Sequence, residues 1–161
     1  MNTKTFSTPQ LTGLVLLRVA IGWHFLYEGL IKIASPNWSS YGYLMDSKGF
    51  MGSFFHSLAA QDQILHFADL LNMWGLVAIG LSLVIGLFSR PAIIAGIILL
   101  AMYYVSHPAF LGLDYALPSE GSYFIINKTF IELLTLYVLF VFPTSKIIGL
   151  DRLIFRNSAS E

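Results

Sequence analysis

Four apolar stretches, each about as long as a membrane is thick, limit what this chain can form more than any other feature. A helix that crosses the hydrocarbon core needs about 20 mostly apolar residues, and its backbone groups must be hydrogen-bonded within the protein. More than half of all residues (56%) are hydrophobic, and the mean hydropathy is +0.70. We therefore predict an all-α integral membrane protein, a four-helix bundle in one domain over residues 1–161, with spans at 11–33, 67–88, 91–106 and 123–142.

Two segments outside the spans have the pattern of helices that lie on a membrane surface. Residues 34–66 are rich in aromatic side chains, and their apolar residues recur at helical spacing at Met51, Phe54, Phe55 and Leu58. After the last span, apolar and basic residues alternate over 146–156. Both patterns predict short interfacial helices, one in the first outer loop and one at the C-terminus.

The loop charges predict the orientation of the bundle. Basic residues gather near the two ends of the chain and at the turn between the second and third spans: Lys4, Arg90, Lys146, Arg152 and Arg156. The other loops hold one lysine and four acidic residues: Lys48, Asp46, Asp62, Asp114 and Glu120. Because basic loops stay in the cytoplasm, we expect a multi-pass protein of a bacterial-type inner membrane with cytoplasmic N- and C-termini. The first stretch is too long and too charged for a cleavable signal peptide, so we expect it to remain as the first span.

Ionisable residues inside the first span share one face of the predicted helix. At about 100° per residue, the four fall within an arc of about 120°: Arg18, His24, Glu28 and Lys32. An ionisable group that faces lipid costs at least about 2.5–3.5 kcal/mol. We therefore expect this face to meet other helices or a water-filled cavity.

Polar residues of all four spans gather at one depth near the outer face. They are Glu28, Lys32, Asp69, Asn72, His107, Asn127, Lys128 and Glu132. Arg18 lies about 15 Å deeper than Glu28 at the helical rise per residue. A shared depth predicts a polar site between the helices, and Arg18 and Glu132 are our preferred functional candidates.

Structural explanations remain open for most of these residues. Glu28–Lys32 and Lys128–Glu132 are spaced i,i+4 and could neutralise each other along their own helices. Lys32 could extend to the headgroups, and His24 could be hydrogen-bonded to a neighbouring helix. Asp69 and Asn72 could cap the second helix. Arg18 has no acidic neighbour in the sequence, so its counter-charge must come from another helix, a ligand or a lipid phosphate.

Two further features of the spans have structural explanations. The small residues of 80–86 (GLSLVIG) permit close helix contact. Tyr103 and Tyr104 are expected in the outer aromatic belt.

Several classes of function are excluded or disfavoured by composition. The chain has no cysteine, which rules out a thiol relay, covalent haem attachment and cysteine-ligated iron–sulfur clusters within it. A net charge of zero gives no reason to expect nucleic acid as a partner. Four scattered histidines with no ligand spacing predict no metal site.

Three motifs, in this order and topology, resemble the DoxX/DoxD family of small four-helix membrane proteins. Residues 17–22 (LRVAIG) followed by 28–32 (EGLIK) are similar to the family's arginine-then-GxxK signature. Residues 80–90 (GLSLVIGLFSR) resemble its second-span ending, and 149–152 (GLDR) its closing motif. Many members carry a glutamate in the second span before the glycines, where this chain has Leu76–Val77.

The resemblance implies a subunit linked to thiosulfate:quinone oxidoreductase, with lipid and a redox subunit or a second copy of the chain as partners. A polar cluster beside an apolar groove suits a quinone substrate. Arg18 or Lys128 would hold negative charge, with His24, Lys32, Asp69, Asn72 and Asn127 as further binding residues. Glu28, Glu132 and His107 would pass protons outward. A non-catalytic scaffold, whose buried charges pair with a partner's helices, is the main alternative, and a proton-linked transporter is a weaker one.

Overall fold

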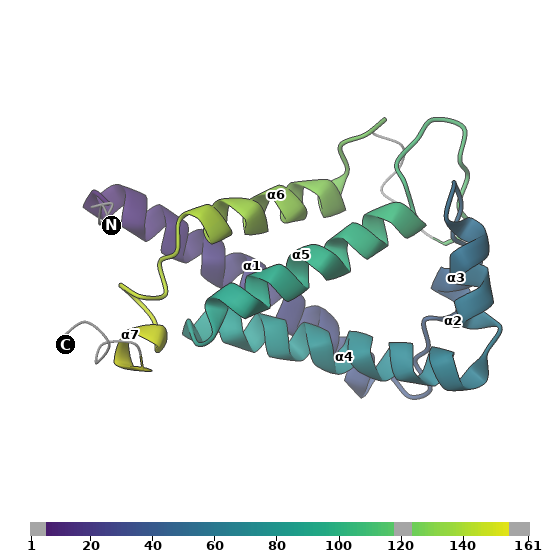
Figure 1. Ribbon diagram of the computed structural model, residues 1–161, viewed down its shortest axis with the longest axis horizontal. Helices are drawn as coiled ribbons and strands as arrows, with labels where there is room; N and C mark the ends of the chain where they lie inside the picture. The colour runs from purple at the N-terminus through teal and green to yellow at the C-terminus, as the bar shows by residue number, and fades with distance from the viewer. Residues whose placement is uncertain (1–5, 118–123, 155–161) are drawn as a thin grey trace.

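Four long helices form the body of the protein in this computed structural model, which describes residues 6–117 and 124–154. They are α1 (Thr8–Ala34), α4 (Asp62–Ile85), α5 (Ser89–Ser106) and α6 (Lys128–Val141), joined by the shorter α2 (Tyr41–Met45), α3 (Gly52–Ala59) and α7 (Asp151–Ile154). The start of α1, the α4–α5 turn and α7 lie at one end, and α2 and α3 at the other (Figure 1). The described residues contain no strand, so the predicted all-α fold is confirmed for them.

The first three predicted spans are confirmed as helices long and apolar enough to cross a membrane. The fourth is shorter than predicted, because α6 has 14 residues against the about 20 that a crossing needs. Asn127 determines where α6 begins, since its side chain accepts a hydrogen bond from the Phe130 N–H at 2.9 Å. Pro143 follows the C-cap Phe142, where helices commonly end. Residue 123, with which the predicted span begins, lies outside the described residues.

Both predicted surface helices are present, with different bounds. The helical spacing around Phe54 corresponds to α3, and α2 precedes it without having been predicted. Within the described residues the C-terminal helix is α7, which begins later than predicted because the segment before it forms turns that pack on the bundle. Residues 155 and 156 of the predicted helix lie outside the described residues. Of the charges used to predict orientation, Lys4, Glu120 and Arg156 lie outside the described residues.

The core lies between the four long helices. Its fully covered side chains come from each of them, with Phe25 on α1, Leu83 on α4, Leu100 on α5 and Leu136 on α6. This shared core places α6 within the bundle despite its short length.

Glycines let α1 and α4 approach at backbone distance. A Cβ added to Gly80 would overlap the backbone of Leu26, and one added to Gly22 would lie 2.8 Å from the Leu83 Cβ. On the other side of the contact, a Cβ on Gly29 would lie 2.7 Å from Val77. Small residues at helix contacts are the usual means of close packing in membranes. The packing role predicted for the glycines of 80–86 is therefore confirmed at Gly80.

Gly86 has a different role, in a cluster that we call the clasp: Arg18, Gly86, Thr144, Ile148, Gly149 and Asp151. Gly86 ends α4 in the left-handed conformation (φ 69°), and a Cβ there would lie 2.7 Å from the Gly149 Cα. The Asp151 carboxylate accepts hydrogen bonds from the Phe88 N–H at 2.8 Å and the Ser89 N–H at 3.3 Å, which caps α5. The segment before α7 is thereby fixed to the α4–α5 turn.

Arg18 completes the clasp from α1. Its Nη1 donates to the Thr144 Oγ1 at 3.0 Å and its Nη2 to the Ile148 carbonyl at 2.8 Å. Asp151 stabilises the guanidinium charge electrostatically. Arg18 is only 3% exposed, so the counter-charge and acceptors that the sequence required come from the C-terminal segment.

Candidate functional site

Two adjoining cavities lie toward the end of the bundle that carries α2 and α3. One of about 410 Å³ is lined by α1 and α6, including His24, Glu28, Lys128 and Glu132. The other, of about 480 Å³, is lined by Trp38, Ser40, Asn72 and Leu117 among others. Both share walls formed by Glu28, Lys32, Tyr43 and Tyr103, and we call them together the polar cavity. Each volume lies within the about 300–1,000 Å³ typical of small-molecule sites.

A carboxylate contact joins α1 to α6 at the edge of this cavity. The His24 Nε2 lies 3.1 Å from the Glu132 Oε1, and the Lys128 Nζ lies 4.0 Å from the same oxygen. The Glu132 side chain is 15% exposed. A covered carboxylate between an imidazole and an ammonium group can hold a proton or pass one to a bound molecule.

The second acidic residue of the cavity is paired along its own helix. The Lys32 Nζ donates to the Glu28 Oε2 at 2.7 Å and lies 5.7 Å from the centre of the Trp38 ring. Glu28 remains 46% exposed. The i,i+4 pairing left open by the sequence therefore forms, while Glu28 still lines the cavity.

Asn72 brings an unpartnered polar atom to the cavity wall. Its Nδ2 donates to the Tyr103 hydroxyl at 2.5 Å, and its Oδ1 is buried without a hydrogen-bond partner. An unmade hydrogen bond of this kind costs about 1–3 kcal/mol, which a ligand hydroxyl or carbonyl could recover, since either orientation of the amide leaves one polar atom free. Tyr103 is part of this wall, whereas the sequence placed it in the aromatic belt.

Two other predicted residues position segments around the cavity. Asp69 is 7% exposed, and its Oδ1 accepts hydrogen bonds from the Ser40 N–H at 2.8 Å and the Ser40 hydroxyl at 2.5 Å. This contact fixes the loop after α1 to α4. The suggestion that Asp69 and Asn72 cap the second helix is wrong, because α4 begins at Asp62, well before both. Asn127 does cap α6.

His107 lies behind the cavity wall, in a layer that we call the cap, residues 43–48 and 107–117. Its ring stacks on Tyr43 with centroids 4.0 Å apart, and the Tyr115 ring lies 4.7 Å away on centroids. The Asp46 carboxylate accepts hydrogen bonds from the Ala116 and Leu117 N–H groups at 3.0 and 2.9 Å. Because Tyr43 and Leu117 line the cavity, the cap forms part of its wall.

Two ionisable groups of the cap, His107 and Asp46, have pKa values shifted by their surroundings. Burial lowers the pKa of His107, Lys48 acts in the same direction, and Asp46 opposes them. The pKa of Asp46 is lowered chiefly by its hydrogen bond from the Leu117 N–H. Both groups have lower pKa values folded than unfolded, so each stabilises the cap above its unfolded pKa and loses that contribution as the pH falls.

Acidification is therefore expected to loosen the cap through His107. Between pH 7.5 and 5.5, a range that brackets the unfolded histidine pKa of about 6.5, protection of the 107–117 amides from hydrogen exchange should fall severalfold after correction for intrinsic rates. His107→Gln should remove most of this pH dependence. His66→Gln, at an exposed histidine of α4, is the matched control and should keep it. Equal pH dependence in both variants would contradict the assignment.

Arg18 is the candidate that the structure places away from the cavity. It lies in the clasp, ten residues before Glu28, which is about 15 Å along α1. Its contacts are with the segment before α7. Three aromatic residues line the cavity without having been predicted as site residues: Trp38, Tyr43 and Tyr103. The only sequence signal for Trp38 and Tyr43 is the high aromatic content of residues 34–66. Among the described residues, no group of three or more His, Asp or Glu side chains comes together as a metal site.

Comparison with known proteins adds one match. The family model DoxX matches residues 13–108, from the first turns of α1 through α5 to the start of the loop that follows it. No curated protein and no solved structure matches the chain.

Proposed function

Because the chain belongs to the DoxX family of membrane proteins, we propose that it is the membrane subunit of a quinone-linked oxidoreductase whose polar cavity binds the quinone headgroup. The observation that carries this proposal is the composition of the cavity wall. Glu132, with His24 and Lys128, forms one side of a site whose other walls hold Asn72 and Tyr103. Ionisable residues inside a membrane bundle mark substrate or proton pathways, and a quinone headgroup needs both hydrogen-bond partners and proton donors.

Reduction of a bound quinone would require proton carriers and charge-balancing groups among these residues. Reduction of a quinone to a quinol takes two electrons and two protons, and each carbonyl oxygen gains one proton. Glu132 and Glu28 are the proposed proton carriers, with His24 supporting Glu132 across the helix contact. Lys128 and Lys32 balance negative charge, and the free amide atom of Asn72 orients one oxygen. His107 acts as a positioning residue by supporting Tyr43.

Thiosulfate is the proposed electron donor. Two thiosulfate ions join through a new sulfur–sulfur bond to give one tetrathionate and release the two electrons that the quinone takes up. The chain has no cysteine, so the electrons pass directly from the donor or through a partner redox subunit. A site that opens on the outer side of the membrane would admit an anion from that side.

The membrane arrangement is part of the same proposal. The helix of α6 spans about 21 Å, short of the about 30 Å hydrocarbon core, and we propose that its flanking residues complete a fourth crossing. Four crossings would keep the start of α1 and α7 on one side, as they lie in Figure 1. By the distribution of basic residues, that side is the cytoplasmic face of an inner membrane.

A scaffold role is less favoured by the charges themselves. Glu28, Lys32, His24, Lys128 and Glu132 find partners within the chain. They therefore do not need the helices of a partner protein to neutralise them.

Binding of a short-tailed quinone tests the proposal. The protein in lipid nanodiscs should bind it saturably, and Glu132→Gln, which keeps the shape and removes the charge, should weaken binding at least about tenfold, as expected for a lost charge-assisted hydrogen bond. Asp62→Asn removes an equal charge at an exposed position of α4 and should leave binding unchanged. Absence of saturable binding by the wild type, or full binding by Glu132→Gln, would overturn the proposal.

A further inference from the structure

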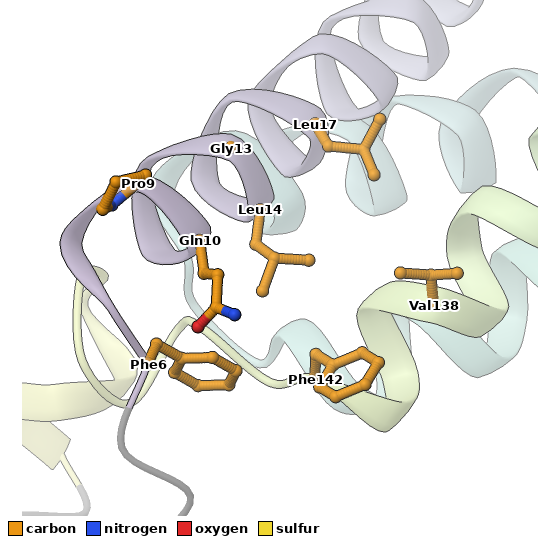
Figure 2. Close-up of a pocket in the computed structure, with 8 residues that line it drawn as sticks. All are labelled: Phe6, Pro9, Gln10, Gly13, Leu14, Leu17, Val138 and Phe142. Atoms are coloured by element: carbon orange, nitrogen blue, oxygen red, sulfur yellow. The ribbon is translucent and has the colours of Figure 1, made fainter.

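A second, apolar cavity lies along the same pair of helices, toward the opposite end. This groove of about 610 Å³ runs between the start of α1 and the end of α6, and is lined by Phe6, Gly13, Leu14, Leu17, Val138 and Phe142 among others. Figure 2 shows these side chains arranged around an open space between the two helices. The Phe6 and Phe142 rings meet edge to face, 6.3 Å apart on centroids, at its far end.

The groove and the polar cavity both lie along the contact between α1 and α6, which we call the seam, and they have no lining residue in common. On α1, the cavity begins at His24, and the groove includes Leu14. On the other helix, the cavity includes Glu132 of α6, and the groove includes Phe142, the residue that follows α6. Leu14 and His24 are ten positions apart, and so are Glu132 and Phe142, which corresponds to about 15 Å along each helix. The His24–Glu132 contact belongs to the cavity wall, and the nearest groove residue on α1, Leu17, lies seven positions before His24, about 10 Å along the helix. The seam therefore has charged side chains around the polar cavity at one end and apolar side chains around the groove at the other.

The lining of the groove is suited to hydrocarbon. Gln10 is its one amide side chain, and the Gln10 Oε1 already accepts a hydrogen bond from the Ser7 N–H at 3.0 Å. A Cβ added to Gly13 would meet no atom within 4 Å. Helix packing therefore does not require glycine at this position, whereas a larger side chain would occupy the groove.

We propose that the α1–α6 seam holds the apolar tail of a long-chain isoprenoid quinone whose headgroup lies in the polar cavity. The inference rests on the proposed function and adds the substrate class, a quinone selected by its tail as well as its head. The position of the groove along the same two helices as the headgroup site favours this occupant over a free lipid chain, because a molecule with one polar end and a long apolar chain matches both parts of the seam. The protein would thus distinguish long-tailed from short-tailed quinones.

The expected preference for a long-tailed quinone depends on what surrounds the tail when it is not bound. A tail that leaves the groove enters lipid, which is equally apolar, so the groove contributes van der Waals packing rather than transfer from water. We therefore expect a preference of about tenfold, measured against quinone concentration in the bilayer.

Gly13→Phe is the test, because Gly13 lines the groove and a Cβ there would meet no atom within 4 Å. Gly75→Phe on α4 is the matched control, since a Cβ there also meets no atom within 4 Å and Gly75 does not line the groove. Two quinones with one headgroup, one with a long isoprenoid tail and one without a tail, are titrated against each protein in nanodiscs. Gly13→Phe should weaken binding of the long-tailed quinone about tenfold, the loss expected when its packing in the groove is removed, and leave the tailless one unchanged. Gly75→Phe should alter neither.

The outcomes separate this inference from the proposed function. If the wild type binds neither quinone, the proposed function fails. If it binds both and Gly13→Phe changes neither affinity, or reduces both equally, only the tail site is overturned. A phospholipid that co-purifies with the wild type and is displaced by Gly13→Phe, with quinone affinity unchanged, would assign the groove to lipid and also overturn it.

Discussion

Gly80→Ala is expected to force α1 and α4 apart and to lower the free energy of unfolding by about 3 kcal/mol, at the upper end of overpacking effects. The added Cβ would overlap the backbone nitrogen and Cα of Leu26 and lie 2.7 Å from the Gly22 carbonyl oxygen. These are backbone atoms of a helix, which cannot rotate away as a side chain can. The bundle must therefore open along its closest contact.

Unfolding by sodium dodecyl sulfate in mixed micelles measures this effect. Gly75→Ala, five residues earlier on α4, is the matched control because its Cβ would meet no atom within 4 Å. The control should be neutral or up to about 1 kcal/mol more stable, since alanine favours helix more than glycine does. Similar curves for the two variants would show that α1 and α4 are not packed at this distance.

Arg18→Leu is expected to cost about 3–5 kcal/mol of stability, because it leaves two hydrogen-bond acceptors without their donor, each at about 1–3 kcal/mol, and removes the cation near Asp151. The substitution leaves the Asp151 charge without its nearby cation and the Ile148 carbonyl and Thr144 hydroxyl without their donor. The segment before α7 should detach from the α4–α5 turn. Loss of protection from hydrogen exchange at 144–154, together with a lower unfolding midpoint, is the expected result.

Arg90→Leu provides the control, an exposed arginine at the same end of the bundle whose described contact is with the Phe140 ring at 5.7 Å. It should cost no more than about 1 kcal/mol, as exposed cation–π contacts do. Combining Arg18→Leu with Asp151→Asn should cost less than the sum of the two changes, because the partners act together. Arg18→Leu with unchanged stability but lost quinone binding would instead place Arg18 in the functional site.

The first three spans were predictable because lipid imposes a length and a polarity on a crossing helix, and both can be read from the order of apolar residues in the sequence. The gathering of polar side chains followed from the same constraint, and the His24–Glu132 contact joins two helices that the sequence could only place at one depth. The residues at which helices begin were harder to predict from the sequence. α4 begins before the apolar stretch, which moves Asp69 from the expected helix end into the helix.

The rest of the site depended on tertiary contacts without a local signal. Nothing near Arg18 in sequence indicates Thr144 or Asp151, which are brought to it by turns after α6. The contacts of the His107 ring with Tyr43 and Tyr115 require segments far apart in the sequence to meet. Such contacts between distant segments have no periodicity, so a single sequence does not display them.

The clasp has a consequence for how the bundle can breathe. α1 is held at Arg18 by the C-terminal segment and at His24 by α6, two anchor points about 9 Å apart along one helix. Beyond His24, α1 packs against α4 at Gly29, and the loop after it is fixed to Asp69, so this part of the helix cannot swing. Motions of α1 should therefore be concentrated in residues 8–17, before Arg18, which gives the helix one stiff end and one mobile end.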